Sequence, residues 1–393
     1  MRYDFDELTD RRQTLSLKWD VDPDEIPMWV ADMDFTTAPC VREAIEKRAA
    51  HGIFGYSIVP DVWYGAYQAW WEKHHGLSIE KEWLIFTTGV IPALSAAVRK
   101  FTTPAEKVLI QTPVYNIFFN TIINNGRFVL ENPLKCENGR YSMDLEDLER
   151  KMSDPQCRMM LLCNPQNPGG ELWSADTLKR VGELALRHHV LVFSDEIHCD
   201  ITAPGKEYVP YMSVSDECRN NCITAISPTK AFNIAGINTA AVAVCDEGLR
   251  QRMNRALNTD EVAEPGSFAV DAAVAAFSDE GYAWLSELRR YIQKNKDWVR
   301  DHLKSELPEI KLFCSDATYL LWMDMSAYLD GTAGNVRELQ GFLRKEAGIY
   351  LSSGDIYGGN GVSFMRMNVA CPASRVSEGF ERLKKGISMW AGR

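Results

Sequence analysis

Residues 190–198 read VLVFSDEIH, an apolar, strand-like run that leads directly into Asp195, Glu196 and, two residues on, His198. Continuous apolar strands are typical of a parallel sheet that helices cover on both faces. Comparable runs occur at 107–114, 158–163, 222–227 and 239–245. These runs predict further strands of the same sheet.

Helix-like segments alternate with these strands, which indicates an α/β layered fold. Ser174 is a suitable N-cap for a helix to about His188, and a tight turn at Gly89 begins a helix to Lys100. Pro60 suits the first turn of another helix, whose inner face is predicted to carry Val62, Ala66, Tyr67 and Trp70. The helical spacing of Trp63, Tyr67, Trp70 and Trp71 is interpreted as core packing.

The character of the sequence changes after about residue 280. The predicted elements there are a helix over 282–307, strands near 311–313 and 319–325, a helix near 336–346, a strand near 363–369 and a final helix from Ser374. This order is α+β in style and indicates a second, smaller domain. Periodicity does not decide whether residues 1–40 join that domain.

The composition is that of a folded protein without a nucleic-acid or membrane signature. Of 393 residues 46% are hydrophobic, and 11 Trp, 14 Tyr and 16 Phe need a core or a pocket. The net charge of −11, without a basic run, argues against nucleic acid. Ten cysteines are too sparse for a disulfide framework, and the N-terminus lacks the apolar region of a signal peptide. We therefore expect a cytoplasmic protein with reduced cysteines and no membrane span.

Functional residues of open α/β sheets gather where strands end, and four segments lie at such places. Gly89 precedes a helix whose first N–H groups suit a phosphate, although this turn alone is an ordinary strand–helix connection. In NPQNPGG at 164–170, two Asn-Pro pairs hold side-chain amides in a fixed orientation.

The other two segments carry ionisable groups. Asp195 ends an apolar strand, where a carboxylate needs a positive partner such as a cationic ligand atom. Lys230, in SPTKAFN at 227–233, follows an apolar strand, and a partly desolvated lysine can form a Schiff base with a carbonyl. Taken singly, His198 and Lys230 also fit a structural histidine and a surface lysine.

Together the four segments call for a cofactor with a phosphate, a pyridinium nitrogen, a hydroxyl and an aldehyde. Pyridoxal 5′-phosphate (PLP) has these groups and combines a lysine Schiff base with an acidic partner of the ring nitrogen. The combination is far more specific than any of its parts, and it predicts PLP as the cofactor.

From about Ile26 to Gly392 the chain resembles the aminotransferase-like superfamily of fold type I PLP enzymes. Its stretches PMWVADMDF at 27–35, FGYS at 54–57 and DEIHCD at 195–200 resemble the cystathionine β-lyase branch of the MalY/PatB type. The resemblance implies a large PLP-binding domain over 44–282, with a mostly parallel seven-stranded sheet between helices. It also implies a small domain built from 1–43 and 283–393.

The same resemblance implies roles around the cofactor. Lys230 would be the Schiff-base lysine and the acid/base, Asp195 would pair with the pyridinium nitrogen, and Tyr115 would stack on the ring. Asn167 and His198 would contact the ring hydroxyl. The implied phosphate contacts are Gly89, Val90, Ser227 and Thr229, and Ile91 is implied as a further cofactor-binding residue.

On the substrate side, the resemblance implies that Arg366 grips the substrate carboxylate in bidentate fashion. The other residues implied there are Asn167, Trp29, Ala31 and Asp32. Tyr56 would reach the cofactor of the other subunit of a homodimer and take part in catalysis. One position departs from many aminotransferases, which carry an arginine eight residues after the lysine. Asn238 stands there and brings no charge, so we expect weaker phosphate binding or compensation from the helix start at Gly89 and the partner chain.

The implied activity is a PLP-dependent carbon–sulfur β-lyase that cleaves L-cystathionine or related cysteine S-conjugates to a thiol, pyruvate and ammonia. A PLP-dependent aminotransferase acting on an amino acid and a 2-oxoacid shares these residues and remains an alternative. A regulatory binding protein without turnover is disfavoured by the joint presence of Lys230, Asp195 and Arg366, and a nicotinamide dehydrogenase by the lack of GxGxxG after a strand. The histidine pairs 74–75 and 188–189 lie at predicted helix ends, suit the helix dipole and are assigned no metal.

Overall fold

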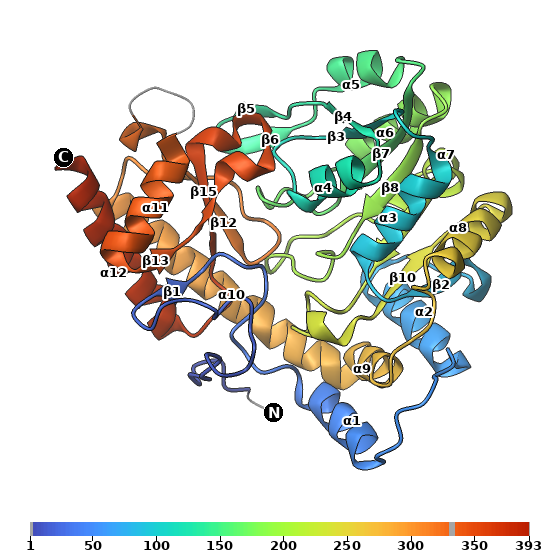
Figure 1. Cartoon of the computed structure of the whole chain (residues 1–393), viewed down its shortest axis with the longest axis horizontal. Helices are drawn as coiled ribbons and strands as arrows, with labels where there is room; N and C mark the ends of the chain where they lie inside the picture. The colour runs from blue at the N-terminus through green and yellow to red at the C-terminus, as the bar shows by residue number, and fades with distance from the viewer. Residues whose placement is uncertain (1–2, 330–334, 393) are drawn as a thin grey trace.

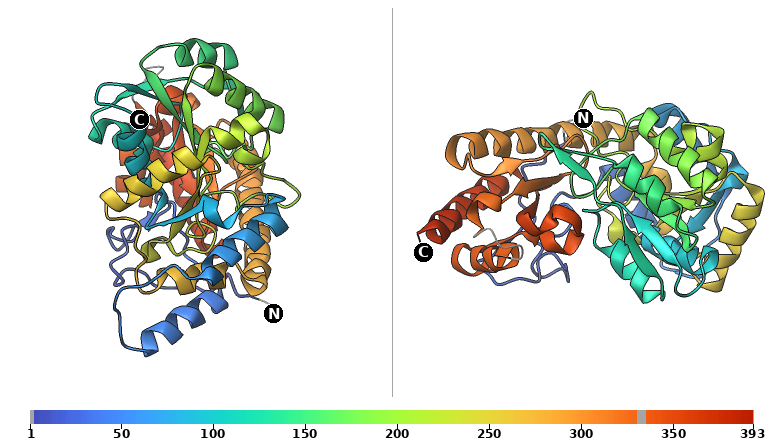
Figure 2. Two further views of the ribbon diagram at one scale, coloured as in Figure 1. Left: turned by 90° about the vertical axis from the view of Figure 1, so that its right-hand side faces the viewer. Right: turned by 90° about the horizontal axis from the view of Figure 1, so that it is seen from above.

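The structure, a computed structural model, describes residues 3–329 and 335–392. Figure 1 shows a large sheet wrapped by helices and, beside it, a smaller sheet built mainly from C-terminal segments. The long helix α10 (Asp279–Glu306) runs from one part to the other. In the view from above in Figure 2, the orange and red C-terminal segments lie to one side of the green segments of the large sheet.

The large sheet has seven strands in the order β2-β10-β9-β8-β7-β3-β4. Their bounds are β2 (Leu84–Thr87), β3 (Lys107–Ile110), β4 (Phe128–Glu131), β7 (Cys157–Cys163), β8 (Leu191–Asp195), β9 (Cys222–Ile226) and β10 (Ala240–Ala243). The pairs from β9 to β4 are parallel, and β10 is antiparallel to both of its neighbours. The predicted mostly parallel seven-stranded sheet is confirmed.

Side chains of the central strands alternate between two apolar layers, as the strand period of two requires. In β3, Val108 and Ile110 belong to one layer and Leu109 to the other. The helices α3 (Val90–Phe101), α4 (Ile117–Asn124) and α8 (Glu247–Thr259) cover the first layer. The helices α2 (Asp61–His75), α5 (Leu145–Met152) and α6 (Ala175–Arg187) cover the second. Both faces are therefore buried, which explains why these strands read as continuous apolar runs.

The predicted inner face of α2 was wrong at one of its four residues, Val62, while Ala66, Tyr67 and Trp70 do face the core. Val62 is 58% exposed, whereas Trp63, Tyr67, Trp70 and Trp71 are buried. These four follow the spacing i, i+4, i+7, i+8 of a single helix face, and Val62 lies about 100° away from Trp63 around the helix. The interpretation of the four aromatic residues as core packing is confirmed.

The smaller sheet has the order β11-β12-β15-β14. Its strands are β11 (Lys311–Leu312), β12 (Leu320–Asp324), β14 (Ser352–Ser353) and β15 (Phe364–Asn368). The helices α11 (Asn335–Ala347) and α12 (Ala373–Ala391) pack on each other beside it. These elements match the predicted α+β order within a few residues.

The N-terminal segment lies against this C-terminal part of the molecule. Strand β1 (Ile26–Pro27) pairs in parallel with β13 (Ile349–Tyr350), and Ile26 and Met28 join the apolar cluster of the C-terminal elements. The predicted boundaries after residues 43 and 282 fall inside α1 (Pro39–Ala50) and α10. The division into 44–282 against 1–43 with 283–393 stays a prediction.

The ten cysteines are all free. Within residues 3–329 and 335–392, no helix combines the length and the apolar character needed to cross a bilayer.

Candidate active site

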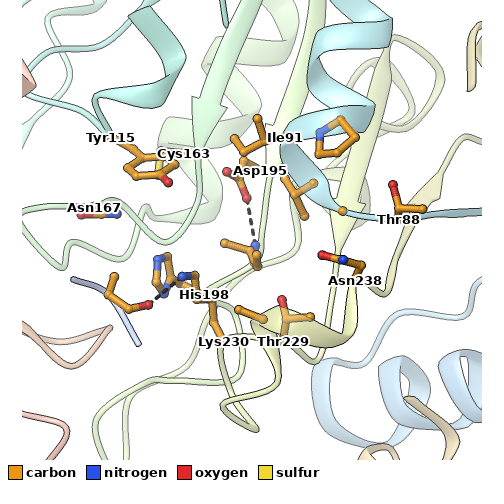
Figure 3. Close-up of a pocket in the computed structure, with 16 residues that line it drawn as sticks. Thr88, Ile91, Tyr115, Cys163, Asn167, Asp195, His198, Thr229, Lys230 and Asn238 are labelled. Carbon is orange, nitrogen blue, oxygen red and sulfur yellow. Dashed lines mark hydrogen bonds between the residues drawn. The ribbon is translucent and has the colours of Figure 1, made fainter. Parts of the chain in front are cut away.

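A cavity of about 530 Å³ opens at the carboxyl ends of the central strands. The predicted site residues that line it are Ala31, Gly89, Val90, Ile91, Tyr115, Asn167, Asp195, His198, Thr229 and Lys230. They come from segments spread over two hundred residues of sequence, and the sheet brings them together because parallel strands end at one edge. In Figure 3, Tyr115, Asn167 and His198 lie on one side of the cavity, and Thr88 and Asn238 lie on the other.

Lys230 follows β9 and reaches into the cavity, where its Nζ donates to the carbonyl oxygen of Ala31 at 2.6 Å (Figure 3). Desolvation lowers the pKa of this amine to about 8. The carboxylates of Asp32 and Asp195 oppose the shift, and the positive charge of Arg366 adds to it. A lysine with such a pKa is partly neutral near physiological pH, as a nucleophile or a proton acceptor requires.

Asp195 is the last residue of β8, and its Oδ1 accepts a hydrogen bond from the backbone N–H of Ile197 at 3.1 Å (Figure 3). Burial raises the pKa of this carboxyl to about 6, against the opposing effects of that bond and of Lys230. A buried carboxyl with so few donors is strongly stabilised by a cation within contact distance. A protonated pyridine nitrogen is such a cation.

His198 and Tyr115 are neutral at physiological pH. Burial, followed by the charges of Lys230 and Arg366, lowers the pKa of His198 to about 3, and burial raises the pKa of Tyr115 to about 12. The Nδ1 atom of His198 is buried without a hydrogen-bond partner. An imidazole nitrogen left open in this way suits a polar group of a bound ligand.

The opposite end of the cavity has the features of a phosphate site. Helix α3 begins directly after Gly89, and the first amides of a helix have no partner within it. A Cβ atom at Gly89 would lie 3.2 Å from Cδ of Pro92, so the turn is narrow. The Ser227 hydroxyl lies 2.8 Å from that of Thr229, and Asn238 also lines this end. These donors are uncharged, as the sequence predicts from Asn238, which stands where many aminotransferases carry an arginine.

Arg366, in β15, reaches toward the cavity from the smaller sheet. Its Nη1 donates to Oδ1 of Asn167 at 3.1 Å, and its Nη2 donates to the carbonyl oxygen of Trp29 at 2.9 Å. Its Nε is buried without a partner. A buried guanidinium that is only partly satisfied, beside a cavity, is suited to a carboxylate ligand.

Five predicted site residues do not line the cavity in this chain. Ser227 and Arg366 lie next to lining residues, through Thr229 and Asn167, and the other three are Tyr56, Trp29 and Asp32. Tyr56 is fully exposed, in a non-helical segment before α2. The ring of Trp29 stacks on Tyr350 with centroids 4.8 Å apart, and the carboxylate of Asp32 pairs with Arg11 at 2.8 Å. Their predicted roles stay predictions.

The sequence reasoning missed several neighbours of the site. Cys163, Ile197 and Ala235 line the cavity. Cys163 is the final residue of β7, so its position at a strand end could have indicated it. Tyr319 donates to the Ala31 carbonyl that also accepts from Lys230, and Arg11 pairs with the carboxylates of Asp32 and Asp34. Nothing in the sequence around these two residues indicates those contacts.

The histidines at the end of α2 belong to a hydrogen-bonded group. Nε2 of His75 lies 2.9 Å from Oδ1 of Asp200, which also accepts from Nε1 of Trp70 at 2.9 Å. The ligand atoms of His75, Cys199 and Asp200 lie within 4.8 Å of one another, a spacing that would suit a metal ion. The hydrogen bonds already account for the geometry, and we assign no ion here.

Taken together, the residues present fit PLP. They offer an amine for its aldehyde, a buried carboxyl for its ring nitrogen, an open imidazole nitrogen for its hydroxyl and a helix start for its phosphate.

The comparisons with known proteins agree with this fit. The family model described as Aminotransferase class I and II matches residues 23–383. The chain is 40% identical to cystathionine beta-lyase PatB of Bacillus subtilis, covering 98% of this chain and 100% of that protein. It is 32% identical to protein MalY of Escherichia coli, covering 98% and 99%. The PLP-containing crystal structure of cystalysin from Treponema denticola matches with a TM-score of 0.94 at 31% identity, over 99% and 100% of the two chains.

Proposed function

Because the chain belongs to the class I and II aminotransferase family, we propose that it is a PLP-dependent carbon–sulfur β-lyase. Its substrates are L-cystathionine or related cysteine S-conjugates. Cystathionine and water give homocysteine, pyruvate and ammonia, as the Cβ–S bond breaks and the leaving sulfur takes a proton. One observation carries the proposal: Lys230 and Asp195 share one cavity in a chain 40% identical along its length to a cystathionine β-lyase.

PLP, when bound, supplies an electron sink that stabilises negative charge at the α-carbon of an amino acid. The side chains of this chain hold and tune it. Asp195 keeps the ring nitrogen protonated, since its carboxylate gains a cationic partner there. Tyr115 would stack on the ring, and Asn167 and His198 would contact the ring hydroxyl. Gly89, Val90, Ser227 and Thr229 would hold the phosphate, with Ile91 as a further cofactor contact.

Lys230 has two successive roles in this proposal. It would anchor the cofactor, and with the substrate bound its free amine would take the proton from the α-carbon. Its lowered pKa, about 8, keeps a useful fraction of the amine neutral for that step. The proton that Lys230 gains can next be given to the departing sulfur, so that one group serves as base and acid.

Arg366 binds the α-carboxylate of the substrate. Its unpaired Nε and the adjacent Nη2, which also donates to the carbonyl oxygen of Trp29, provide the two parallel donors that a carboxylate accepts. The carbonyl of Trp29 accepts from Arg366 and that of Ala31 from Lys230, and Asp32 follows directly in the chain. We assign these three residues to the substrate side of the site.

The steady release of pyruvate tests elimination against amino transfer. We expect the purified chain with PLP to form pyruvate from L-cystathionine without any added 2-oxoacid, and the Lys230→Ala variant to form none above background. Rapid exchange of amino groups with a 2-oxoacid, with no pyruvate from cystathionine or from a panel of cysteine thioethers, would establish the aminotransferase instead.

We also propose that the active unit is a homodimer in which Tyr56 completes the site of the other subunit. The segment before α2 presents Ile53, Phe54, Tyr56 and Ile58 to solvent, and this apolar character suits a surface that a second copy covers. Tyr56 can then assist proton transfer to the leaving sulfur.

Hybrid dimers test this proposal. We expect chains carrying Tyr56→Ala and chains carrying Lys230→Ala to be nearly inactive when each is alone. Differently tagged chains, co-expressed and purified as the hybrid, regain about half of the wild-type turnover because one of the two sites is then native. A hybrid as inactive as its parents would contradict the shared site.

A further inference from the structure

Residues 28–33, which we call the strap, are irregular backbone that passes beside the cavity. Each of their carbonyl oxygens accepts a hydrogen bond from another part of the chain. The donors to Met28, Trp29, Val30, Ala31, Asp32 and Met33 include backbone and side-chain groups. The carbonyl oxygen of Ala31 accepts twice, from Nζ of Lys230 at 2.6 Å and from the hydroxyl of Tyr319 at 2.9 Å. The strap therefore fixes where the lysine amine lies.

Two asparagines, close in sequence to Lys230 and Arg366, form hydrogen bonds with the strap. Asn233, three residues after Lys230, accepts from the N–H of Met33 at 2.9 Å and donates to its carbonyl at 3.0 Å. Asn368, two residues after Arg366, donates to the carbonyls of Val30 and Asp32, each at 2.6 Å. Displacement of the strap would therefore move the carbonyl groups that accept hydrogen bonds from Lys230 and Arg366.

Arg11 holds the strap from its outer side. Its guanidinium pairs with Asp32 and with Asp34, each at 2.8 Å, and donates to the carbonyl of Met33 at 2.8 Å. Lys18 pairs with Asp34 at 3.0 Å and lies 3.9 Å from Asp32. Asp34 is thus held by two cations, whereas Arg11 is the close partner of Asp32.

Asp32 carries charge into the surroundings of Lys230. The groups that act on this amine are the carboxylates of Asp32 and Asp195 and the guanidinium of Arg366. His198 and Tyr319 also face this amine and are uncharged near neutral pH. Asp32 favours the protonated amine, so any cation that offsets Asp32 favours the neutral amine that proton abstraction needs.

On the basis of the proposed function, we propose that Arg11 is a positioning residue of the reaction. It holds the strap whose Ala31 carbonyl binds the Lys230 amine, and it offsets the negative charge that Asp32 places beside that amine. Arg11 itself touches neither cofactor nor substrate. Without Arg11, the charge of Asp32 acts on Lys230 with less opposition, and the neutral amine forms only at higher pH.

The direct test is the protonation of Lys230 in the full-length chain freed of PLP. Acetic anhydride reacts with the neutral amine, and peptide mass spectrometry gives the extent of Lys230 acetylation as a function of pH. We expect the midpoint to rise by roughly half a unit to one unit in Arg11→Gln. It should fall in Asp32→Asn and stay near the wild-type value in Arg11→Lys.

Two further variants separate this effect from a general loss of structure. Arg12→Gln removes the neighbouring arginine, whose bonds to the carbonyls of Pro23 and Glu25 do not involve Asp32, and should leave the midpoint unchanged. In the Asp32→Asn background, Arg11→Gln should also have no further effect on the midpoint, because the charge it offsets is gone.

An unchanged or lowered midpoint in Arg11→Gln would overturn the inference, as would an equal shift in Arg12→Gln. In the PLP-loaded enzyme, the acidic limb of kcat, which reports the enzyme–substrate complex, should move upward in Arg11→Gln and downward in Asp32→Asn. The outcomes are separable from those of the proposed function. A wild-type chain that makes no pyruvate rejects the lyase and leaves the acetylation result standing, whereas an active lyase with an unmoved midpoint rejects only the role of Arg11.

Discussion

Two lysines with similar electrostatics lie in different parts of this molecule. Lys230 faces the cavity at the end of β9, and Lys296 lies within α10, only 1% exposed. Each donates to backbone carbonyls: Lys230 to Ala31, and Lys296 to Ser315 at 3.0 Å and Ala317 at 3.3 Å. Desolvation is the main cause of the lowered pKa in both, to about 8 and about 7.

The difference lies in what surrounds the amine. Lys296 is enclosed by carbonyls and packed helix, and no part of it borders the cavity. Lys230 borders open space and has Asp195 and Arg366 acting on it. A lowered pKa therefore reports mainly burial, and the function follows from the open space and the charged groups that a ligand can contact.

The largest expected effect separates the two lysines directly. Lys230→Ala should lower turnover by about a thousandfold or more, because it removes both the covalent anchor and the proton acceptor. It should also abolish the visible absorption band of the lysine-bound cofactor. Lys296→Met should keep the band and turnover within a few-fold. A Lys296→Met chain that folds, as judged by circular dichroism, but loses the band would break the comparison.

Asp195 acts on Lys230 and borders the cavity, whereas the carboxylates that act on Lys296, those of Asp297 and Asp316, do not border it. Asp195→Asn should lower kcat by about a hundredfold, because the ring nitrogen loses the carboxylate that keeps it protonated. Glu196→Gln is the matched control: Glu196 is the next residue and is buried among Ser194, Tyr208 and the Tyr211 N–H, away from the cavity. Steady-state kinetics should show a small change there, and equal losses in both variants would contradict the assignment.

Arg366 sharpens the comparison on the substrate side. Arg366→Lys should raise KM for L-cystathionine by about tenfold to a hundredfold, since a lysine cannot offer two parallel donors to a carboxylate. Arg344→Lys provides the control. Arg344 makes a bidentate pair with Glu25, at 2.6 and 2.9 Å, and its helix, α11, carries none of the predicted site residues. An unchanged KM in Arg366→Lys would reject the carboxylate role.

The smallest effect concerns stability and tests Lys296. Its pKa is about 7 in the fold and near 10.4 when unfolded, so between these values the unfolded chain binds the extra proton. Folding stability then rises with pH, by at most about 1.4 kcal/mol per unit for one proton, and the penalty is complete below the folded pKa. Denaturant unfolding at pH 7, 8 and 9 should show a shallower rise in Lys296→Met than in wild type.

The control for that experiment is Lys304→Met, on the exposed face of the same helix, which should keep the wild-type slope. Parallel pH curves for Lys296→Met and wild type would show that the buried amine is not neutral in the fold.

Strand ends were the most reliable signal in the sequence. Asp195 and the NPQNPGG stretch could be placed because an apolar run followed by polar residues marks the carboxyl edge of a sheet, and that edge is where the cavity lies. Val62 was wrongly assigned to the inner face of α2 because Val62 and Trp63 are both apolar. Which of the two is buried depends on the segments that pack against the helix in the folded chain.

The sequence by itself determined the sheet, its helices and the chemical types gathered at the cavity, because hydrophobic periodicity and strand-end residues are local properties of the chain. Only the tertiary structure decided that Arg366 and Lys230 are linked through the strap, that Asp32 faces Arg11, and that one buried lysine borders a cavity while another does not. Those relations join residues up to 337 positions apart. No local pattern encodes them, since they arise when distant segments are packed into one low-dielectric interior.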